Sequence, residues 1–243
     1  MGDRDAYRER TYRHLLYSRN LCHFQVAVRE TDLDIAARED LTAQAYDSIH
    51  RHRHFLEQYI RIFPTFSQSL KPLPDDPMAP PIVREMLKAA STAGVGPMAA
   101  VAGAMAAFVG RDLLRFSPEV IVENGGDVFI ARNSTVRVGV FAGTSPLSNK
   151  LVLTVDASRM PLGVCTSSAT VGPSLSFGRA DAVCVLAPSV ALADAAASAI
   201  GNLVLKKDDI QRALDFGATI PGVEGIVIVF RDNLGVWGDI TFA

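Results

Sequence analysis

The 243-residue chain contains little of what several classes of protein require. Its 24 Lys and Arg residues are balanced by 26 Asp and Glu residues, so it lacks the basic excess typical of nucleic-acid binders. Aromatic residues make up only 7%, which also disfavours a surface on which bases stack. The three cysteines are far apart without CxxC spacing, which argues against a disulfide framework or a zinc knuckle. We therefore expect a small-molecule ligand, no nucleic-acid partner and a reducing compartment.

Long apolar runs and an apolar N-terminal segment are also missing. Six of the first ten residues are charged and no apolar segment follows them, so we expect no secretory signal. No stretch approaches the roughly 20 uninterrupted apolar residues that span a bilayer. These absences predict a cytoplasmic protein without a membrane partner. With 49% hydrophobic and 21% charged residues, the chain has the composition to bury a sizeable core.

The hydrophobic pattern predicts an α+β chain in which one order of elements occurs twice. In the first half we expect a strand pair over 11–17 and 22–30, helices over 38–62, 82–92 and 98–110, and a hairpin over 120–130. In the second half we expect a strand pair over 135–142 and 150–156, a loop over 157–179, a strand over 181–186, helices over 190–203 and 206–216, and a hairpin over 226–240. This order predicts one domain, residues 1–243, made of two β-β-α-α-β-β repeats (about 1–133 and 134–243). Its sheets are expected to be antiparallel, with helices on one face.

Two of the expected helices are rich in alanine. The first has six alanines among residues 98–107, and the second has six among residues 191–199. Small side chains let another backbone approach closely, so we expect both helices in equivalent, deeply buried places. The second helix contains one acid, Asp194, in an otherwise apolar stretch, and Ser198 lies one turn later on the same face. A carboxylate and a hydroxyl so placed are suited to Mg²⁺. The alternative is a structural pair within the helix.

A polar turn, Glu123-Asn124-Gly125-Gly126-Asp127, separates two expected strands. Paired glycines accept positive φ, and their N–H groups are suited to facing an anion. The carboxylates of Glu123 and Asp127 are suited to holding a cation. The alternative is an ordinary hairpin turn, because Asn-Gly is the commonest hairpin signal.

A loop that begins at Cys165 is rich in hydroxyl side chains and contains Thr166, Ser167 and Ser168. Such a loop is suited to binding phosphate or a carbonyl group. Cys165 is a candidate nucleophile, but all five histidines lie at or before His54, so no base is near in sequence. The alternative is a buried structural cysteine.

A histidine tract, His50, His52 and His54, alternates with Arg51 and Arg53. Because charge runs usually face water, we interpret it as a solvated basic helix surface in preference to a metal site.

Two of these segments resemble motifs of the ApbE-type flavin transferases. Residues 122–128 resemble their Asn-x-Gly-Gly-Asp turn. Residues 193–195 with Ser198 resemble their Ala-Asp-Ala-x-x-Thr metal motif, with Ser in place of Thr. The chain is still more similar to a branch of that superfamily without an assigned activity. The segments shared with this branch are residues 30–33, 95–103, 123–127, 165–168, 176–183 and 193–197.

This resemblance implies a tandem T-fold, Mg²⁺ at Asp194 and Ser198, and a flavin nucleotide as a ligand. The chain departs from the transferases at residues 172–177, which lack the acid of their flavin-binding stretch. It also has Pro173 where the branch usually has His, and so loses a base near Cys165.

We therefore expect a small phosphate-bearing or acidic ligand in a pocket between the repeats of a homodimeric protein, with Mg²⁺ as the expected cofactor. One alternative is an Mg²⁺-dependent FMN transferase that uses FAD. A second is a non-catalytic, thiol-bearing accessory or binding protein, and a third is an oligomeric scaffold. The expected ligand-binding residues are Gly94, Gly96, Glu123, Asn124, Gly125, Gly126, Asp127, Cys165, Thr166, Ser167 and Ser168.

Overall fold

The computed structural model describes residues 16–17, 20–171 and 176–243. The main-sheet strands are β2 (Cys22–Val28), β3 (Thr31–Ala37), β4 (Val120–Asn124), β5 (Asp127–Ala131), β8 (Leu162–Ser167), β9 (Ala182–Ala187), β10 (Gly225–Phe230) and β11 (Asn233–Gly238). A small sheet contains β1 (Leu16–Tyr17), β6 (Val136–Gly139) and β7 (Val152–Val155). The helices are α2 (Thr42–Ile62), α3 (Thr65–Gln68), α4 (Pro81–Ala93), α5 (Val101–Leu113), α6 (Val190–Gly201) and α7 (Asp209–Ala218), with short 3₁₀ turns η2 (Pro97–Ala100) and η3 (Ala157–Arg159).

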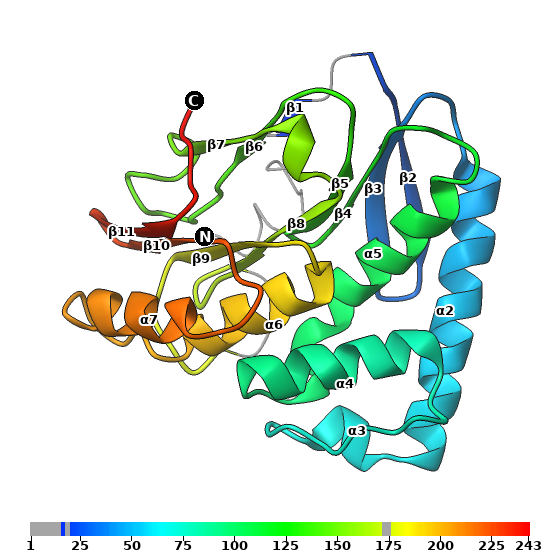
Figure 1. Ribbon diagram of the computed structural model, residues 1–243, viewed down its shortest axis with the longest axis horizontal. Helices are drawn as coiled ribbons and strands as arrows, with labels where there is room; N and C mark the ends of the chain where they lie inside the picture. The colour runs from blue at the N-terminus through cyan, green and yellow to red at the C-terminus, as the bar shows by residue number, and fades with distance from the viewer. Residues whose placement is uncertain (1–15, 18–19, 172–175) are drawn as a thin grey trace.

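The main sheet has eight antiparallel strands in the order β11-β10-β9-β8-β5-β4-β3-β2. Helices α5, α6 and α7 pack against one face, and the small sheet covers the other (Figure 1). Strands β5, β9 and β10 are buried along their whole length, because both of their faces are covered. Val122 thus joins the helix-side core while its neighbour Ile121 joins the core beneath the small sheet. The expected α+β class with antiparallel sheets is confirmed.

The second half of the sheet differs from the sequence prediction. Strands β6 and β7 pair with each other as expected, but they belong to the small sheet. The first pair of this half is instead β8 and β9, and β8 lies inside the expected loop 157–179. The strand was missed because its apolar run is short and it ends in two polar residues, Thr166 and Ser167.

The N-terminal strand pair was also predicted wrongly. Strand β1 pairs with β6, whereas β2 pairs with β3. The rest of the expected strand, residues 11–15, lies outside the described residues. Its partner was misassigned because the alternation within residues 22–28 suits either neighbour. Pairing with β3 buries Phe24, Val26 and Val28 in the helix-side core.

The alanine-rich helices α5 and α6 pack against each other. A Cβ built on Gly103 of α5 would lie 2.6 Å from the Val190 carbonyl oxygen and 2.8 Å from Asp194 Cβ. A Cβ built on Gly163 of β8 would lie 2.6 Å from Val190 Cα. Glycine is therefore required on both sides of the start of α6. This close packing brings Asp194 to the first turn of α5.

Across the described residues, no single helix has the length and apolar character needed to cross a membrane. One bent pair, Pro81–Ala93 with Pro97–Leu113, meets the criteria by length and composition, with an angle of 106° between its two parts.

Candidate functional site

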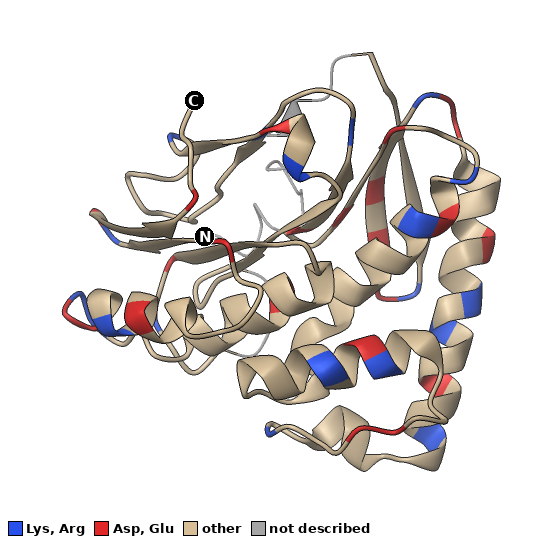
Figure 2. Cartoon of the chain, viewed as in Figure 1, with Lys and Arg blue, Asp and Glu red and all other residues tan. Residues whose placement is uncertain are grey.

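Two carboxyl groups from different halves of the chain line one cavity of about 430 Å³. Asp127 begins β5, and Asp194 lies in the middle of α6, which is otherwise almost free of charge (Figure 2). The Gly103 N–H in the first turn of α5 donates to Asp194 Oδ2 at 2.8 Å. Asp194 therefore caps α5 and interacts favourably with the positive end of that helix. Ser198, one turn further along α6, lines the same cavity.

Burial raises the pKa of both carboxyl groups. It raises the pKa of Asp194 to about 7, against lowering by the N–H groups of Gly103 and Ala102. Burial, followed by the negative charge of Asp194, raises the pKa of Asp127 well above its ordinary value. Within the described part of the chain, no Lys, Arg or His side chain pairs with either carboxyl. Ionising both carboxyls is therefore unfavourable in the metal-free protein, and a bound cation would favour the ionised form.

Cys165 lies directly behind this pair. It is opposite Asp127 in the β5–β8 register and is fully buried. Its thiol donates to the Val190 carbonyl oxygen at 3.4 Å. Burial and the charges of Asp127 and Asp194 raise the pKa of the Cys165 thiol well above its usual range. Since the thiolate is the nucleophile, this site keeps Cys165 in its unreactive form.

In the polar turn before Asp127, some side chains hold the turn together and some residues line a cavity. The Gly126 N–H donates to Glu123 Oε1 at 2.8 Å, so Glu123 closes its own turn and is buried. Asn124 Nδ2 donates to the Ala102 carbonyl oxygen at 3.0 Å and so ties the turn to α5. Asn124 and Gly125 line a second cavity of about 440 Å³ that also reaches Asp127. The turn is thus a hairpin turn fixed by Glu123 and Asn124, and its role in ligand binding stays a prediction.

The other expected ligand-binding residues lie in different places. Gly96 lines the first cavity, where a Cβ would lie only 1.9 Å from the Ser69 carbonyl oxygen. Gly94 caps the C-terminus of α4 with a φ of 77° and lines neither cavity. Thr166, Ser167 and Ser168 likewise are not among the described residues that line the two cavities. Ser168 Oγ instead accepts the N–H groups of residues 170 and 171 in a local turn.

Sequence reasoning missed Arg53, which lines the second cavity. Its guanidinium donates to Thr31 Oγ1 at 2.7 Å, to Glu30 at 2.7 Å and to Glu57 at 2.8 Å. Only 15% of the side chain is exposed, so Arg53 does not belong to a solvated surface as predicted. The segment 30–33 was the one available signal, because it supplies two of these partners. Missed residues of the first cavity are Ser67, Ser69, Leu70, Phe177 and Asn202.

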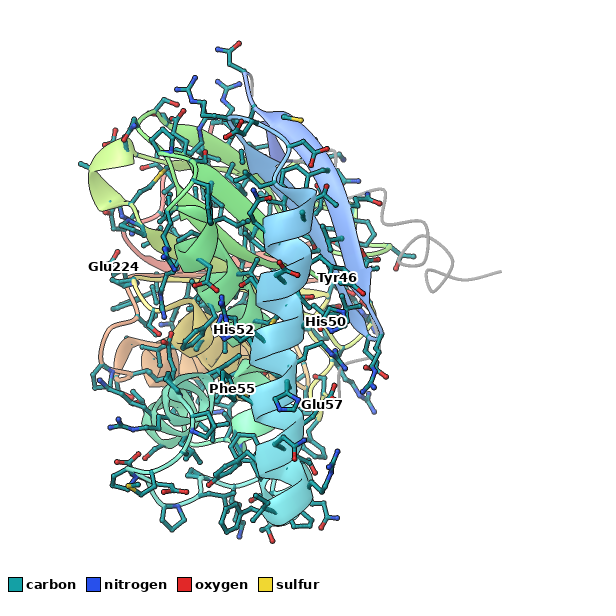
Figure 3. All side chains as sticks on the ribbon, turned by 90° about the vertical axis from the view of Figure 1, so that its right-hand side faces the viewer. Tyr46, His50, His52, Phe55, Glu57 and Glu224 are labelled. Carbon is teal, nitrogen blue, oxygen red and sulfur yellow. The ribbon has the colours of Figure 1, made fainter. Side chains whose placement is uncertain are left out.

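The histidine tract divides between two sides of α2 (Figure 3). His50 packs against Tyr46, with ring centroids 4.3 Å apart and ring planes tilted by 56°. His52 is turned toward α5, where its Nε2 lies 2.8 Å from Asp112 Oδ2, and burial lowers its pKa. The tract does not converge on one point, and no group of three or more His, Cys, Asp or Glu residues that suits a metal occurs among the described residues.

The family model described as "AbpE bacteria" matches residues 13–237. The chain belongs to this family. The UPF0280 protein of Methanosarcina acetivorans is 40% identical over 221 residues, which cover 90% of this chain and 86% of that protein. The UPF0280 protein of Methanospirillum hungatei is 42% identical over 220 residues, which cover 90% and 87%. The chain therefore lies in the branch that the motifs indicated.

Solved structures show the same fold at low identity. The Pseudomonas stutzeri flavinyl transferase ApbE, in its apo form, has a TM-score of 0.52 and 13% identity, covering 89% of this chain and 94% of that one. The apbe protein of Thermotoga maritima has a TM-score of 0.52 and 12% identity, covering 88% and 96%. At these identities the likeness shows an ApbE-like fold alone.

Proposed function

We propose that the protein binds a small phosphate-bearing or acidic ligand together with Mg²⁺ in the cavity between Asp127 and Asp194. The observation that carries the proposal is this pair of carboxyls, one buried and one half-buried, which lines the cavity without a cationic partner among the described residues. The described lining of that cavity includes both carboxyls and no Lys or Arg. An anion entering alone would be repelled, so its binding must depend on a cation.

The side chains present suit Mg²⁺. This ion prefers oxygen ligands, keeps several waters, and is held by one or two carboxylates together with phosphate oxygens of the ligand. Asp127 and Asp194 would supply the carboxylates, and Ser198 a hydroxyl oxygen. When bound, Mg²⁺ supplies positive charge that neutralises the pair and attracts the anion. The Gly103 N–H holds Asp194 in place, so this carboxylate is positioned before the ion arrives.

The rest of the cavity is suited to the body of such a ligand. The hydroxyl groups of Ser67 and Ser69 line it, and their oxygens are able to accept a hydrogen bond, because each O–H already donates to a backbone carbonyl oxygen. The Asn202 amide also lines it, and its Nδ2 is able to donate. The Asn202 amide is already oriented, because its Oδ1 accepts the Phe177 N–H at 2.9 Å. Phe177 also lines the cavity with a 56% exposed side chain, which offers an aromatic face to a ring.

A second candidate is an Mg²⁺-dependent FMN transferase that uses FAD. Its support is the fold shared with the flavinyl transferase of Pseudomonas stutzeri. The third candidate, a thiol-bearing accessory protein, finds no support at Cys165, because that thiol is buried and its pKa is raised.

Equilibrium dialysis with ATP, FMN and FAD at pH 8 tests the proposal. We expect at least one of these to bind in Mg²⁺, to be released by EDTA, and to fail to bind Asp194→Asn. Asp47→Asn, which removes an exposed carboxylate on α2, is the control and should bind like the wild type. Binding of the same strength in EDTA, or by Asp194→Asn, would contradict the proposal. Release of FMN or AMP from FAD would select the transferase.

We also infer that the main sheet is built from two T-fold repeats, about 1–133 and 134–243. Each half of the sheet follows the order strand pair, helices, strand pair, first with β2–β5 and then with β8–β11. The proposed site then lies between equivalent helices, α5 and α6. A homodimer remains our expectation, and light scattering on the full chain tests it.

A further inference from the structure

A separate cavity of about 600 Å³ carries an excess of positive charge. Its lining includes four basic residues, Arg179, Lys206, Lys207 and Arg231, against one acid, Asp181. They come from three separate segments of a chain whose formal net charge is -2. None of the described residues that line it also lines the two cavities at Asp127. This cavity is therefore a different site from the one proposed above.

The single acid does not neutralise these cations. Asp181 is 7% exposed and its Oδ2 accepts the N–H of Arg231, and this one negative charge is set against four positive charges. In the described part of the chain, Arg179 and Lys207 form no ion pair. Lys206 Nζ lies 3.9 Å from Asp208 Oδ2, with both side chains at least 70% exposed. Surface pairs of this kind contribute little, so the cavity keeps its positive charge.

Arg231 stands where the backbone favours a different residue. It is in the tight turn between β10 and β11, with a left-handed φ of 56°. Glycine or asparagine is preferred in such turns. Two buried side chains fix the conformation, because Asp181 accepts the Arg231 N–H and Ser145 Oγ donates to its carbonyl oxygen. The geometry of the turn therefore does not explain why an arginine occupies position 231.

We propose that this cavity binds the phosphate groups of a small, soluble di- or triphosphate. Phosphate oxygens accept charge-assisted hydrogen bonds from Arg and Lys, and several cations around one hollow match a ligand with several charges. The concave shape, the three converging segments and the overall acidic chain favour a compact ligand over an extended nucleic acid. The segment that carries Arg179 is held to the segment before the lysines, because the Arg179 N–H donates to the Val204 carbonyl oxygen at 2.7 Å.

Titration calorimetry of the full chain with inorganic pyrophosphate in EDTA tests the proposal. We expect one site in the wild type, and affinity at least about tenfold weaker in Arg179→Ala and in Lys207→Ala. Arg231→Gly should weaken binding similarly while its melting temperature stays at or above that of the wild type, because glycine suits the turn. Lys150→Ala, which removes an exposed cation elsewhere, is the matched control and should bind within twofold of the wild type.

Asp194→Asn separates this proposal from the previous one. It should keep full pyrophosphate affinity in EDTA, even if the Mg²⁺-dependent site is absent or lost. The proposal is overturned if the wild type does not bind at millimolar pyrophosphate, or if Lys150→Ala weakens binding as much as Lys207→Ala does. It is also overturned if anionic phospholipid vesicles or a short RNA bind through these residues and pyrophosphate does not displace them.

Discussion

Replacing Asp194 with Asn should make the metal-free protein more stable at neutral and alkaline pH. The amide keeps an oxygen for the Gly103 N–H, which now donates to Asp194 Oδ2 at 2.8 Å, and it removes one buried charge. It also removes the negative charge that raises the pKa of Asp127. Stability at pH 4 should change little, because Asp194 is then largely protonated in the folded wild type.

The size of the effect follows from the shifted pKa. Burial raises the pKa of Asp194 from 3.8 to about 7. Each unit of difference between the folded and unfolded states corresponds to about 1.4 kcal/mol. The folded state holds the proton more tightly, so wild-type stability falls as pH rises from about 4 to 7, by up to about 4 kcal/mol. Because Asp194 is partly open to the cavity, a value of about 2–4 kcal/mol is expected.

Urea denaturation between pH 4 and pH 8 measures this effect in EDTA. The wild type should lose stability across that range, and Asp194→Asn should lose less, because Asp127 is then the one member of the pair that still ionises. Asp47→Asn should follow the wild type, because it removes an exposed charge. Adding Mg²⁺ at pH 8 should restore stability to the wild type and not to Asp194→Asn. A wild type whose stability is flat from pH 4 to pH 8, or an Asp194→Asn protein that is less stable at pH 8, would refute the reasoning.

Three further predictions concern the surroundings of this pair. Gly103→Ala should lower the free energy of unfolding by about 1–3 kcal/mol, as measured in urea, because the new Cβ would lie 2.6 Å from the Val190 carbonyl oxygen. A thiol reagent at pH 7.5 should modify exposed Cys22 quickly and Cys165 only after unfolding; equal rates would show that Cys165 is not buried. Ser198→Ala should weaken Mg²⁺ binding in calorimetry while Ser198→Thr preserves it, and unchanged affinity in Ser198→Ala would exclude this hydroxyl as a ligand.

Periodicity and composition were enough to predict every α-helix of the described residues except the one-turn α3. The 3.6-residue period of apolar residues predicted α2 within a few residues of its observed start, and the alanine content identified α5 and α6 as closely packed. Partners of strands were harder to predict. Strand β8 is short and ends in hydroxyl residues, and β6 pairs with the distant β1. The pairing of a strand depends on which of its apolar faces is buried by another element, and this is decided by tertiary packing.

The candidate site shows the same division. Asp194 was visible in the sequence, because an acid in an apolar helix needs a partner or a function. The turn that precedes Asp127 was recognised from its Asn-Gly-Gly sequence as well. The role of Arg53 was not, because its burial depends on Thr31 and Glu30 at the start of a strand far from it in sequence. The environment of Cys165 also depends on contacts that only the folded chain brings together.

Isothermal titration of Mg²⁺ into the metal-free full chain at pH 8 tests the central claim most directly. We expect the wild type to bind one ion and to release protons, because burial raises the pKa of Asp194 to about 7 and raises that of Asp127 well above its ordinary value. The double variant Asp127→Asn with Asp194→Asn should bind none at this site and release no protons. No heat of binding in the wild type, or the same binding by the double variant, would contradict the account.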